Sequence, residues 1–182
     1  PYMQMSILCK YKRNENEEEF IMAVRPIIYD PDPILYKKCH PVTKFDKKLG
    51  NILTDMTQTM LDANGVGLAG PQIGYMRRVC VVLDTLDNDR IIEMVNPEVV
   101  ETEGEQTGSE GCLSFPNKFG MVTRPRIVTV RAQDRNGEWF TVKSHDLTAR
   151  AFLHEIDHLD GHVFTEKVTE YIHYDEEEDE AE

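Results

Sequence analysis

The sequence predicts an α+β fold in which two helices pack with small antiparallel sheets. Two stretches, residues 46–64 and 146–161, carry apolar side chains at helical spacing. Between them lie short β-branched runs separated by turn sequences, which predict antiparallel strands. No internal repeat is visible, and 182 residues are enough for one sizeable core. We therefore expect a single domain built around the second helix.

Three regions are expected along the chain. Residues 1–21 are polar and rich in glutamate, and we interpret them as an N-terminal extension or an engineered remnant. Residues 22–170 are expected to form the single catalytic domain. Residues 171–182 contain seven acidic side chains and predict a disordered tail. Because much of the formal net charge of −13 lies in this tail and no basic stripe is present, general nucleic-acid binding is disfavoured.

Hydropathy and cysteine usage predict a protein that works inside the cell. No apolar run approaches the roughly 20 residues needed to span a bilayer. The first 21 residues lack the long apolar stretch of a secretory signal. The four cysteines, Cys9, Cys39, Cys80 and Cys112, are widely spaced and predict no disulfide framework. Cys80 lies in an apolar run and is expected to be a small core residue.

The first helix is expected over residues 46–64, with Asp46 as its N-cap and Gly65 as its stop. Residues 65–72 then hold three glycines within six positions and predict a tight, ordered loop. This loop is not a phosphate-binding loop, because it lacks the Gly-Lys-Ser/Thr ending and follows a helix.

Five short runs rich in β-branched residues are expected to be strands. They cover residues 78–84, 91–95, 98–102, 127–132 and 138–143. Turn sequences at 87–89 and 135–137 predict two hairpins, and Asn96-Pro97 is expected to break the strand pattern.

The second helix carries the pattern His-Glu-x-x-His from His154 to His158. Its N-cap is expected at Asp146 or Thr148, its stop at Gly161, and its apolar face at Phe152, Ile156 and Leu159. Helical residues four apart differ by about 40° and about 6 Å, so His154 and His158 can bind one metal ion. Glu155 lies on the neighbouring stripe, where it can act on water beside the metal. A helix with two solvated histidines would give the same pattern. Evidence for a further ligand is needed to distinguish it from a metal site.

A catalytic metal needs at least one more protein ligand and a position for water. A metzincin would place a histidine at position 164, where this chain has Phe164. A zincin of the other type would use a downstream glutamate, and spacing alone allows Glu166, Glu170 or the tail acids. Cys112 is the remaining candidate.

Three motifs in order make the sequence resemble the peptide deformylase family. They are Gly65-Val-Gly-Leu-Ala-Gly-Pro-Gln72, Glu110-Gly-Cys-Leu-Ser114 and His154-Glu-Ile-Asp-His158. Similar stretches at Asn96-Pro97, Pro125, 134–137 and 159–164 extend the resemblance over roughly residues 22–166. Each motif is modest by itself, but the three together are highly specific.

The resemblance implies that Cys112, His154 and His158 bind one divalent metal. Iron(II) is the usual ion of the family, and Zn2+, Ni2+ or Co2+ can replace it in purified protein. The implied reaction removes the formyl group from the N-terminal formylmethionine of newly made polypeptides and releases formate. Glu155 would be the general base, while Gln72 and the backbone N–H of Leu113 would stabilise the oxyanion.

The resemblance also implies a substrate site along the motifs. The backbone around Val66 and Gly67 would pair with an extended peptide. The methionine side chain would enter an apolar pocket beside Leu113 and His154, and Arg150 is expected at its entrance. The residues assigned to substrate binding are Val66, Gly67, Gly111, Leu147, Arg150 and Ala151.

Two positions depart from the family pattern. Gly70 replaces the second alanine of Leu-Ala-Ala-Pro-Gln, which is expected to loosen the loop that carries Gln72. Leu153 replaces the glutamine before the first histidine, so a polar neighbour of the ligands is lost. Phe115 and residues 117–121 fall in the region that varies and shapes the substrate cleft.

Two other classes of protein share parts of this pattern. A zinc endopeptidase would use the helix and Glu155 but would not need Cys112 or Gln72. A non-catalytic metal-binding module would not need Glu155. The resemblance favours an enzyme acting on nascent N-formylmethionyl peptides in a bacterial-type cytoplasm, ahead of an organelle. A transient ribosome contact is expected, with no membrane and no specific nucleic acid as partners.

Overall fold

The computed structural model describes residues 23–173, and these residues adopt the predicted α+β fold. Its helices are α1 (Lys47–Asp62) and α2 (Asp146–Asp160), with short 3-10 helices η1 (Pro33–Tyr36), η2 (Gly70–Ile73) and η3 (Phe164–Lys167). Its strands are β1 (Gly67–Ala69), β2 (Val79–Asp84), β3 (Arg90–Glu103), β4 (Gln106–Cys112), β5 (Phe115–Arg124), β6 (Ile127–Gln133), β7 (Trp139–His145) and β8 (Glu170–Ile172). The predicted extension at residues 1–21, with Cys9, and the tail from residue 174 lie outside the described residues.

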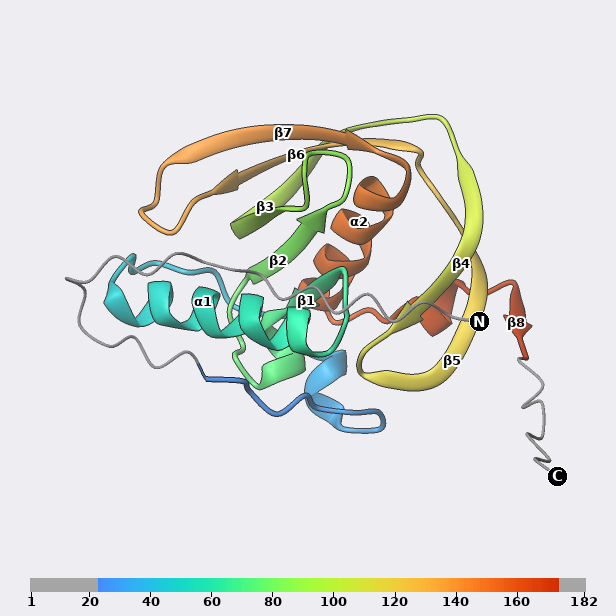
Figure 1. Ribbon diagram of the computed structural model, residues 1–182, viewed down its shortest axis with the longest axis horizontal. Helices are drawn as coiled ribbons and strands as arrows, with labels where there is room; N and C mark the ends of the chain where they lie inside the picture. The colour runs from blue at the N-terminus through green and yellow to red at the C-terminus, as the bar shows by residue number, and fades with distance from the viewer. Residues whose placement is uncertain (1–22, 174–182) are drawn as a thin grey trace, which may run out of the picture.

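Two antiparallel sheets flank the second helix. Five strands form one sheet in the order β1-β2-β3-β6-β7, and three form another in the order β4-β5-β8. Helix α2 packs against strands of the larger sheet, while α1 packs against β1 and β2. Figure 1 shows α2 in the middle of the molecule, between the larger sheet and the long curved ribbon of β4 and β5. Strands β1 and β4 are each at an edge of their sheet.

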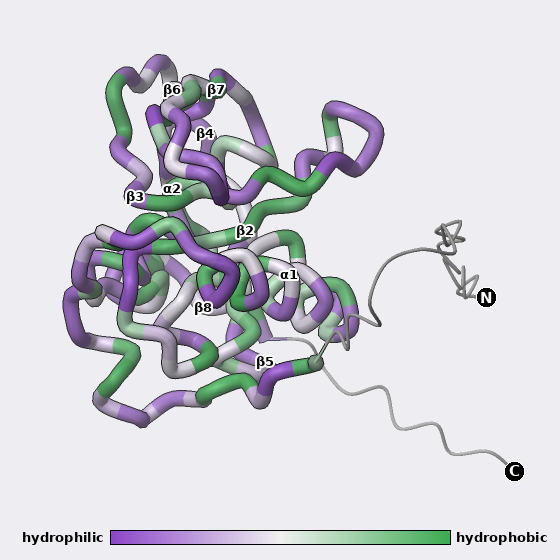
Figure 2. The backbone as a smooth tube through the Cα atoms, turned by 90° about the vertical axis from the view of Figure 1, so that its left-hand side faces the viewer, coloured by the Kyte–Doolittle hydropathy of each residue, from purple (hydrophilic) through white to green (hydrophobic). Residues whose placement is uncertain are grey.

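Strand β2 divides the core because its side chains alternate between the two helices. Cys80 and Val82 belong to the apolar cluster that contains the buried face of α2. Val79 and Val81 belong to the cluster that contains the buried face of α1. Cys80 is therefore a core residue, as predicted. Figure 2 shows the apolar segments gathered around β2 and α2, with polar segments on the outer loops.

No helix among residues 23–173 is long and apolar enough to cross a lipid bilayer.

Helix α1 begins after Asp46 as predicted and ends at Asp62, two residues before the predicted end at residue 64. The Asp46 side chain accepts a hydrogen bond from Leu49 N at 3.0 Å, which satisfies one of the free N–H groups of the first turn. At the other end Asn64, and not the predicted stop Gly65, takes the left-handed conformation, with φ of 54°. Gly65 N then donates to Met60 O at 2.9 Å.

The predicted break at Asn96-Pro97 is wrong. Strand β3 is continuous from Arg90 to Glu103, and its pairing with β6 shifts register between Val95 and Glu98. Asn96 has φ of 51°, so the chain forms a bulge that accommodates Pro97 and then resumes pairing. The bulge keeps both halves of the strand in one sheet.

The structure has strands and a 3-10 helix where the sequence analysis predicted no regular secondary structure. Residues 65–72 were expected to be a loop, but they contain β1 and most of η2. Strands β4 and β5 were not predicted over residues 106–124, because their glycines and charged residues hide the alternating pattern. Strand β8 pairs with β5, so the fold extends two residues beyond the boundary predicted at residue 170.

Candidate metal centre

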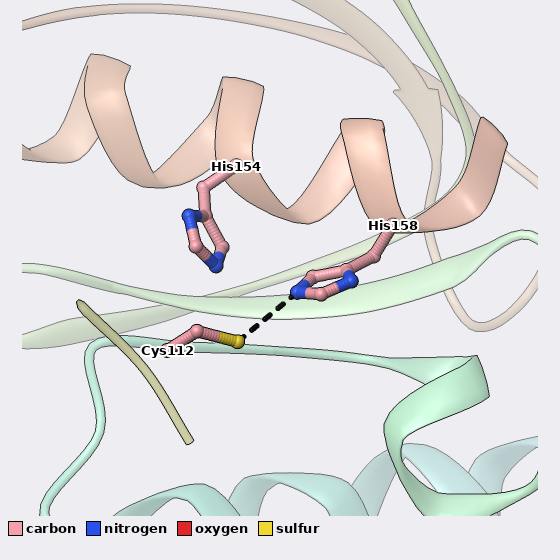
Figure 3. A group of neighbouring side chains, drawn as sticks. All are labelled: Cys112, His154 and His158. Atoms are coloured by element: carbon pink, nitrogen blue, oxygen red, sulfur yellow. Dashed lines mark hydrogen bonds between the residues drawn. The ribbon is translucent and has the colours of Figure 1, made fainter. Parts of the chain in front are cut away.

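Three side chains from two elements converge where β4 ends beside α2. Cys112 is the last residue of β4, and His154 and His158 lie one turn apart on α2. One donor atom from each of the three lies within 4.8 Å of the others. Cys112 Sγ is 3.3 Å from His158 Nε2, and Figure 3 shows both imidazole rings directed from α2 towards the sulfur. A thiolate and two imidazoles fit a catalytic divalent metal, which takes three protein ligands and keeps one position for water.

The alternative third ligands are excluded for the part of the chain that the structure describes. Within residues 23–173 the only group of three metal-binding side chains is Cys112, His154 and His158. Glu166 is exposed and pairs with His162, and Glu170 is exposed on β8. The tail acids from residue 175 lie outside the described residues.

The start of α2 differs from the prediction. The N-cap is His145, one residue before Asp146, and Asp146 itself has φ of 50°. Thr148 instead donates a hydrogen bond to the buried Asp84 on β2 at 3.0 Å. This bond joins the first turn of α2 to the sheet and helps to place the face of the helix that carries His154. Gly161 ends the helix with φ of 82°, as predicted.

Gln72 is buried beside the sulfur of Cys112. Its Oε1 accepts a hydrogen bond from Ala69 N at 2.8 Å, which fixes the orientation of the amide. Its Nε2 lies 3.5 Å from Cys112 Sγ and 3.1 Å from Ser114 Oγ. The 3-10 helix η2 therefore presents an oriented N–H donor at the metal centre.

Glu110 is a functional residue that the sequence analysis quoted only as part of a motif. It is buried, and its Oε2 lies 3.1 Å from His154 Nδ1. Arg124 donates to both of its oxygens at 2.6 and 2.9 Å, and Arg150 donates to Oε1 at 2.8 Å. Burial alone would raise the pKa of Glu110, but hydrogen bonds from Arg124 and His154 hold it well below its usual value. A carboxylate that accepts from Nδ1 leaves Nε2 of His154 available to a metal.

Arg150, which was expected at the entrance of the pocket, is among the residues that line the cleft beside the metal centre, and its side chain is largely buried. The residue is only 6% exposed. Besides Glu110, its guanidinium donates to the carbonyl oxygen of Val122 at 3.0 Å. Its charge is thus already paired, and its role is to hold β4 and β5 against α2.

Glu155 lies next to the ligands and is buried, at 4% exposure. Burial raises the pKa of its carboxyl to about 7. His158 behaves differently, because burial and then the neighbouring His154 and Arg124 lower its pKa and keep the ring neutral. A neutral imidazole and a carboxyl that titrates near neutrality are what a metal ligand and a general base require.

A cleft of about 570 Å³ opens beside the metal centre. It is lined by Cys112, His154, Glu155, Gln72 and Leu113, and by the six residues predicted for substrate binding: Val66, Gly67, Gly111, Leu147, Arg150 and Ala151. His158 lies behind this wall and is fully buried. Leu147 is 46% exposed at the cleft, and Ala151 is buried. The fold thus brings the three sequence motifs to one cavity.

Comparison with known proteins assigns the chain to a family. A family model described as polypeptide deformylase matches residues 24–172. The chain belongs to the peptide deformylase family. The peptide deformylase of Lachnoclostridium phytofermentans is 48% identical over 163 residues, which cover 87% of this chain and 100% of that protein. Peptide deformylase 1 of Bacillus subtilis is 50% identical over 155 residues, covering 85% and 96% of the two chains.

Solved structures agree with this assignment. A peptide deformylase from Legionella pneumophila superposes with a TM-score of 0.77 at 44% identity, covering 81% of this chain and 87% of that one. A class I type b peptide deformylase from Acinetobacter baumannii with Met-Ala-Ser bound gives 0.76 at 33% identity, covering 81% and 100%. As a member of the family, the chain is a metal-dependent hydrolase that removes the formyl group from newly made polypeptides.

The structure explains one departure from the deformylase pattern. A Cβ atom at Gly70 would lie 2.5 Å from the carbonyl oxygen of Tyr75 and 2.8 Å from that of Arg77. Gly70 therefore lets the chain pack closely at this point, while its expected effect on the mobility of the loop stays a prediction. Leu153, the second departure, is half-buried and packs against the cluster on the inner face of α2. An apolar contact thus occupies the place where the family pattern has a polar side chain.

Proposed function

We propose that Cys112, His154 and His158 hold a single divalent metal and that iron(II) is the ion bound in the cell. The convergence of their donor atoms within 4.8 Å beside the cleft carries this proposal. Thiolate and imidazole donors suit iron(II), zinc, nickel and cobalt, so the donor set is compatible with each. The choice of iron rests on the family resemblance.

Glu155 is proposed as the general base and acid of formyl hydrolysis. When bound, the metal supplies a Lewis acid that activates water and polarises the formyl carbonyl. Glu155 accepts a proton from the attacking water, while the oxygen of that water forms a bond to the formyl carbon. The carboxyl then gives this proton to the peptide nitrogen as the C–N bond breaks. The products are formate and a peptide with a free amine.

Gln72 and Leu113 are proposed to stabilise negative charge on the formyl oxygen. The amide of Gln72 is held by Ala69 N, so its Nε2 donor is fixed beside the sulfur of Cys112. Leu113 follows Cys112 directly, in the turn between β4 and β5, and can contribute its backbone N–H. Loss of one such donor typically lowers kcat by about 10²- to 10³-fold.

An extended N-formylmethionyl peptide is proposed to bind between the edges of β1 and β4. Both strands are at sheet edges, and Val66, Gly67 and Gly111 line the cleft between them. A sheet edge can pair with an extended peptide through backbone hydrogen bonds. Leu147 and Ala151 offer apolar surface for the methionine side chain. Met-Ala-Ser, bound in the Acinetobacter baumannii structure, is the kind of peptide that such a reaction would release.

The biological setting is also proposed. The relatives from Lachnoclostridium phytofermentans and Bacillus subtilis are bacterial, which supports a bacterial-type cytoplasm as the place of action, ahead of an organelle. A transient ribosome contact follows from a nascent-chain substrate, and no specific nucleic acid is proposed as a partner. The division into residues 1–21, 22–170 and 171–182 stays a prediction apart from the short extension of the fold by β8.

Formate release from a short formyl-Met peptide tests the proposed function. Anaerobically prepared, iron-loaded protein is expected to release formate, and Cys112→Ala is expected to lose both metal and activity. Cys39→Ala is the matched control, because Cys39 is a buried thiol that does not belong to the group of side chains that could hold a metal. Glu155→Gln should retain metal while turnover falls by about 10²-fold or more.

Two outcomes would contradict the proposal. Cleavage of internal peptide bonds by protein that retains metal in Cys112→Ala would favour a zinc endopeptidase. Metal binding through the three ligands without formate release would favour a non-catalytic module.

A further inference from the structure

Strand β1 presents alternate residues to the two helices. Leu68 packs in the cluster that contains the buried face of α1, and Ala69 packs in the cluster that contains α2. Because side chains alternate along a strand, Gly67 faces α2, on the same side as Ala69. Gly67 is paired with Val82 on β2, so its position relative to the sheet is fixed.

The space above Gly67 is filled by the side chain of Glu155. A Cβ atom at Gly67 would lie 2.3 Å from Glu155 Oε1, 2.8 Å from Cδ and 2.9 Å from Cγ. All three distances are shorter than ordinary van der Waals contact. The missing side chain therefore forms a notch into which the carboxylate fits.

No side-chain hydrogen bond within the described residues holds the second oxygen of this carboxylate. Glu155 Oε2 is buried and has no hydrogen-bond partner within residues 23–173. By contrast, Gln72 and Glu110 at the same centre are held by several hydrogen bonds each. Packing against Gly67 thus orients the Glu155 carboxylate, whereas hydrogen bonds orient the side chains of Gln72 and Glu110.

We propose that Gly67 is a positioning residue that sets the place of the Glu155 carboxylate through this steric notch. The role is separate from backbone pairing with a substrate peptide, which uses the strand edge and not the face towards α2. The inference rests on the proposed function in that Glu155 is taken as the base. It predicts that a methyl group at this position displaces the carboxylate and lowers kcat while KM stays nearly unchanged.

A double-mutant cycle on activity tests the proposal. Gly67→Ala in the parent protein is expected to lower kcat by about 10²-fold, as a displacement near 1 Å can do. Glu155→Asp shortens the side chain by one methylene and removes the atom that lies nearest to the added methyl group, Oε1 at 2.3 Å, so the clash is smaller. In that background Gly67→Ala should change kcat by less than about threefold, because the two substitutions then act on one contact. Equal factors in both backgrounds would overturn the proposal.

A cycle on thermal stability tests the same contact without depending on turnover. Gly67→Ala in the metal-free parent should lower Tm by roughly 5 °C, because a methyl group is forced into filled space. With Glu155→Ala the space is empty, so Gly67→Ala should leave Tm unchanged or raise it. The same drop in both backgrounds would contradict the notch.

Controls separate this proposal from the proposed function. Gly50→Ala on α1 is the matched control, since a Cβ there meets nothing within 4 Å, and it should leave kcat unchanged. The Gly67→Ala protein should bind one equivalent of Co2+ as the parent does. Absence of formate release by the parent would refute the proposed function. If the parent releases formate but Gly67→Ala lowers kcat by the same factor in the parent and in the Glu155→Asp background, only the role of Gly67 is refuted.

Discussion

At the scale of the residue, the metal centre depends on charges that are paired out of contact with water. Glu110 accepts from His154 and is held by Arg124 and Arg150, and all four side chains are buried. Such a network holds the His154 ring in one orientation. Each buried charge in it destabilises the fold when its partner is removed. Glu155 is the opposite case, a buried carboxyl that gains little from its neighbours.

Glu110→Gln is expected to weaken both folding and metal binding. The change leaves Arg124 and Arg150 without their shared carboxylate, so the free energy of unfolding should fall by roughly 3–5 kcal/mol. Metal affinity should fall about 10- to 100-fold because His154 loses its partner at Nδ1. Denaturant unfolding and competition with a chelator measure the two effects. Glu103→Gln, which breaks an exposed pair with Lys143, should change unfolding by less than about 1 kcal/mol; equal effects would contradict the argument.

Glu155→Gln is expected to stabilise the metal-free protein above neutral pH. The pKa of Glu155 is raised by burial from 4.5 to about 7, so the folded state keeps a proton that the unfolded chain releases. The stability of the parent should therefore fall as pH rises from 4.5 to 7, by up to roughly 3 kcal/mol. The glutamine variant should lack this part of the pH dependence. Unfolding in chelator at pH 5 and pH 8 measures it, and identical curves for both proteins would contradict it.

At the scale of the element, β3 shows how one side chain keeps a strand continuous. Asn96 Oδ1 accepts from Val42 N at 2.8 Å, and its Nδ2 donates to Val42 O and to Gln133 Oε1, each at 2.9 Å. These bonds join the segment before α1 to β3 and β6. They also compensate the left-handed backbone at Asn96, so the bulge before Pro97 is stable.

Asn96→Ala is expected to lower the free energy of unfolding by roughly 2–4 kcal/mol. Part of this loss arises because alanine is less favourable than asparagine in the left-handed conformation. Most of it is the loss of three hydrogen bonds. Asn88 is a matched control, because it also has positive φ, at 49°, but is exposed in the turn between β2 and β3. Asn88→Ala should cost only about 1 kcal/mol. Equal losses in denaturant titrations would mean that the hydrogen bonds of Asn96 contribute nothing.

At the level of the whole molecule, the proposed metal ligands come from both halves of the fold. Cys112 ends β4 in the smaller sheet, whereas His154 and His158 come from the helix that packs against the larger sheet. The N-terminal segment makes a second connection, since Ile28 N donates to Gln72 O and Asp30 N to Ser114 O. A ligand held between two parts of a fold stabilises both against separation.

Removal of the metal is therefore expected to lower the stability of the whole domain. Metal at about 1,000 times its Kd adds about 4 kcal/mol, which corresponds to roughly 8–16 °C in Tm for a domain of this size. Scanning calorimetry with and without chelator measures the shift. Cys112→Ala should abolish most of it, whereas Cys39→Ala should retain it. A full shift in Cys112→Ala would show that the metal binds elsewhere.

Features that depend on the spacing of neighbouring residues could be predicted from the chain alone. The helix periodicity of residues 46–64 and 146–161, the hairpin turns and the one-turn separation of His154 and His158 are properties of neighbouring residues. The three motifs also identified the family before the fold was known. Their residues line one cleft, as the resemblance implied.

Features that depend on residues far apart in the chain became visible only in the folded protein. Glu110 contacts Arg124, Arg150 and His154 because β4, β5 and α2 come together in the fold. No local sequence pattern predicts these contacts. The continuity of β3 depends on bonds from Asn96 to Val42 and Gln133, so a local reading of Asn-Pro as a break was wrong. Gly67 and Gly70 likewise became interpretable once Glu155, Tyr75 and Arg77 were seen to fill the space beside them. Spacing fixes the direction of a side chain along its own element, but packing fixes what that side chain meets.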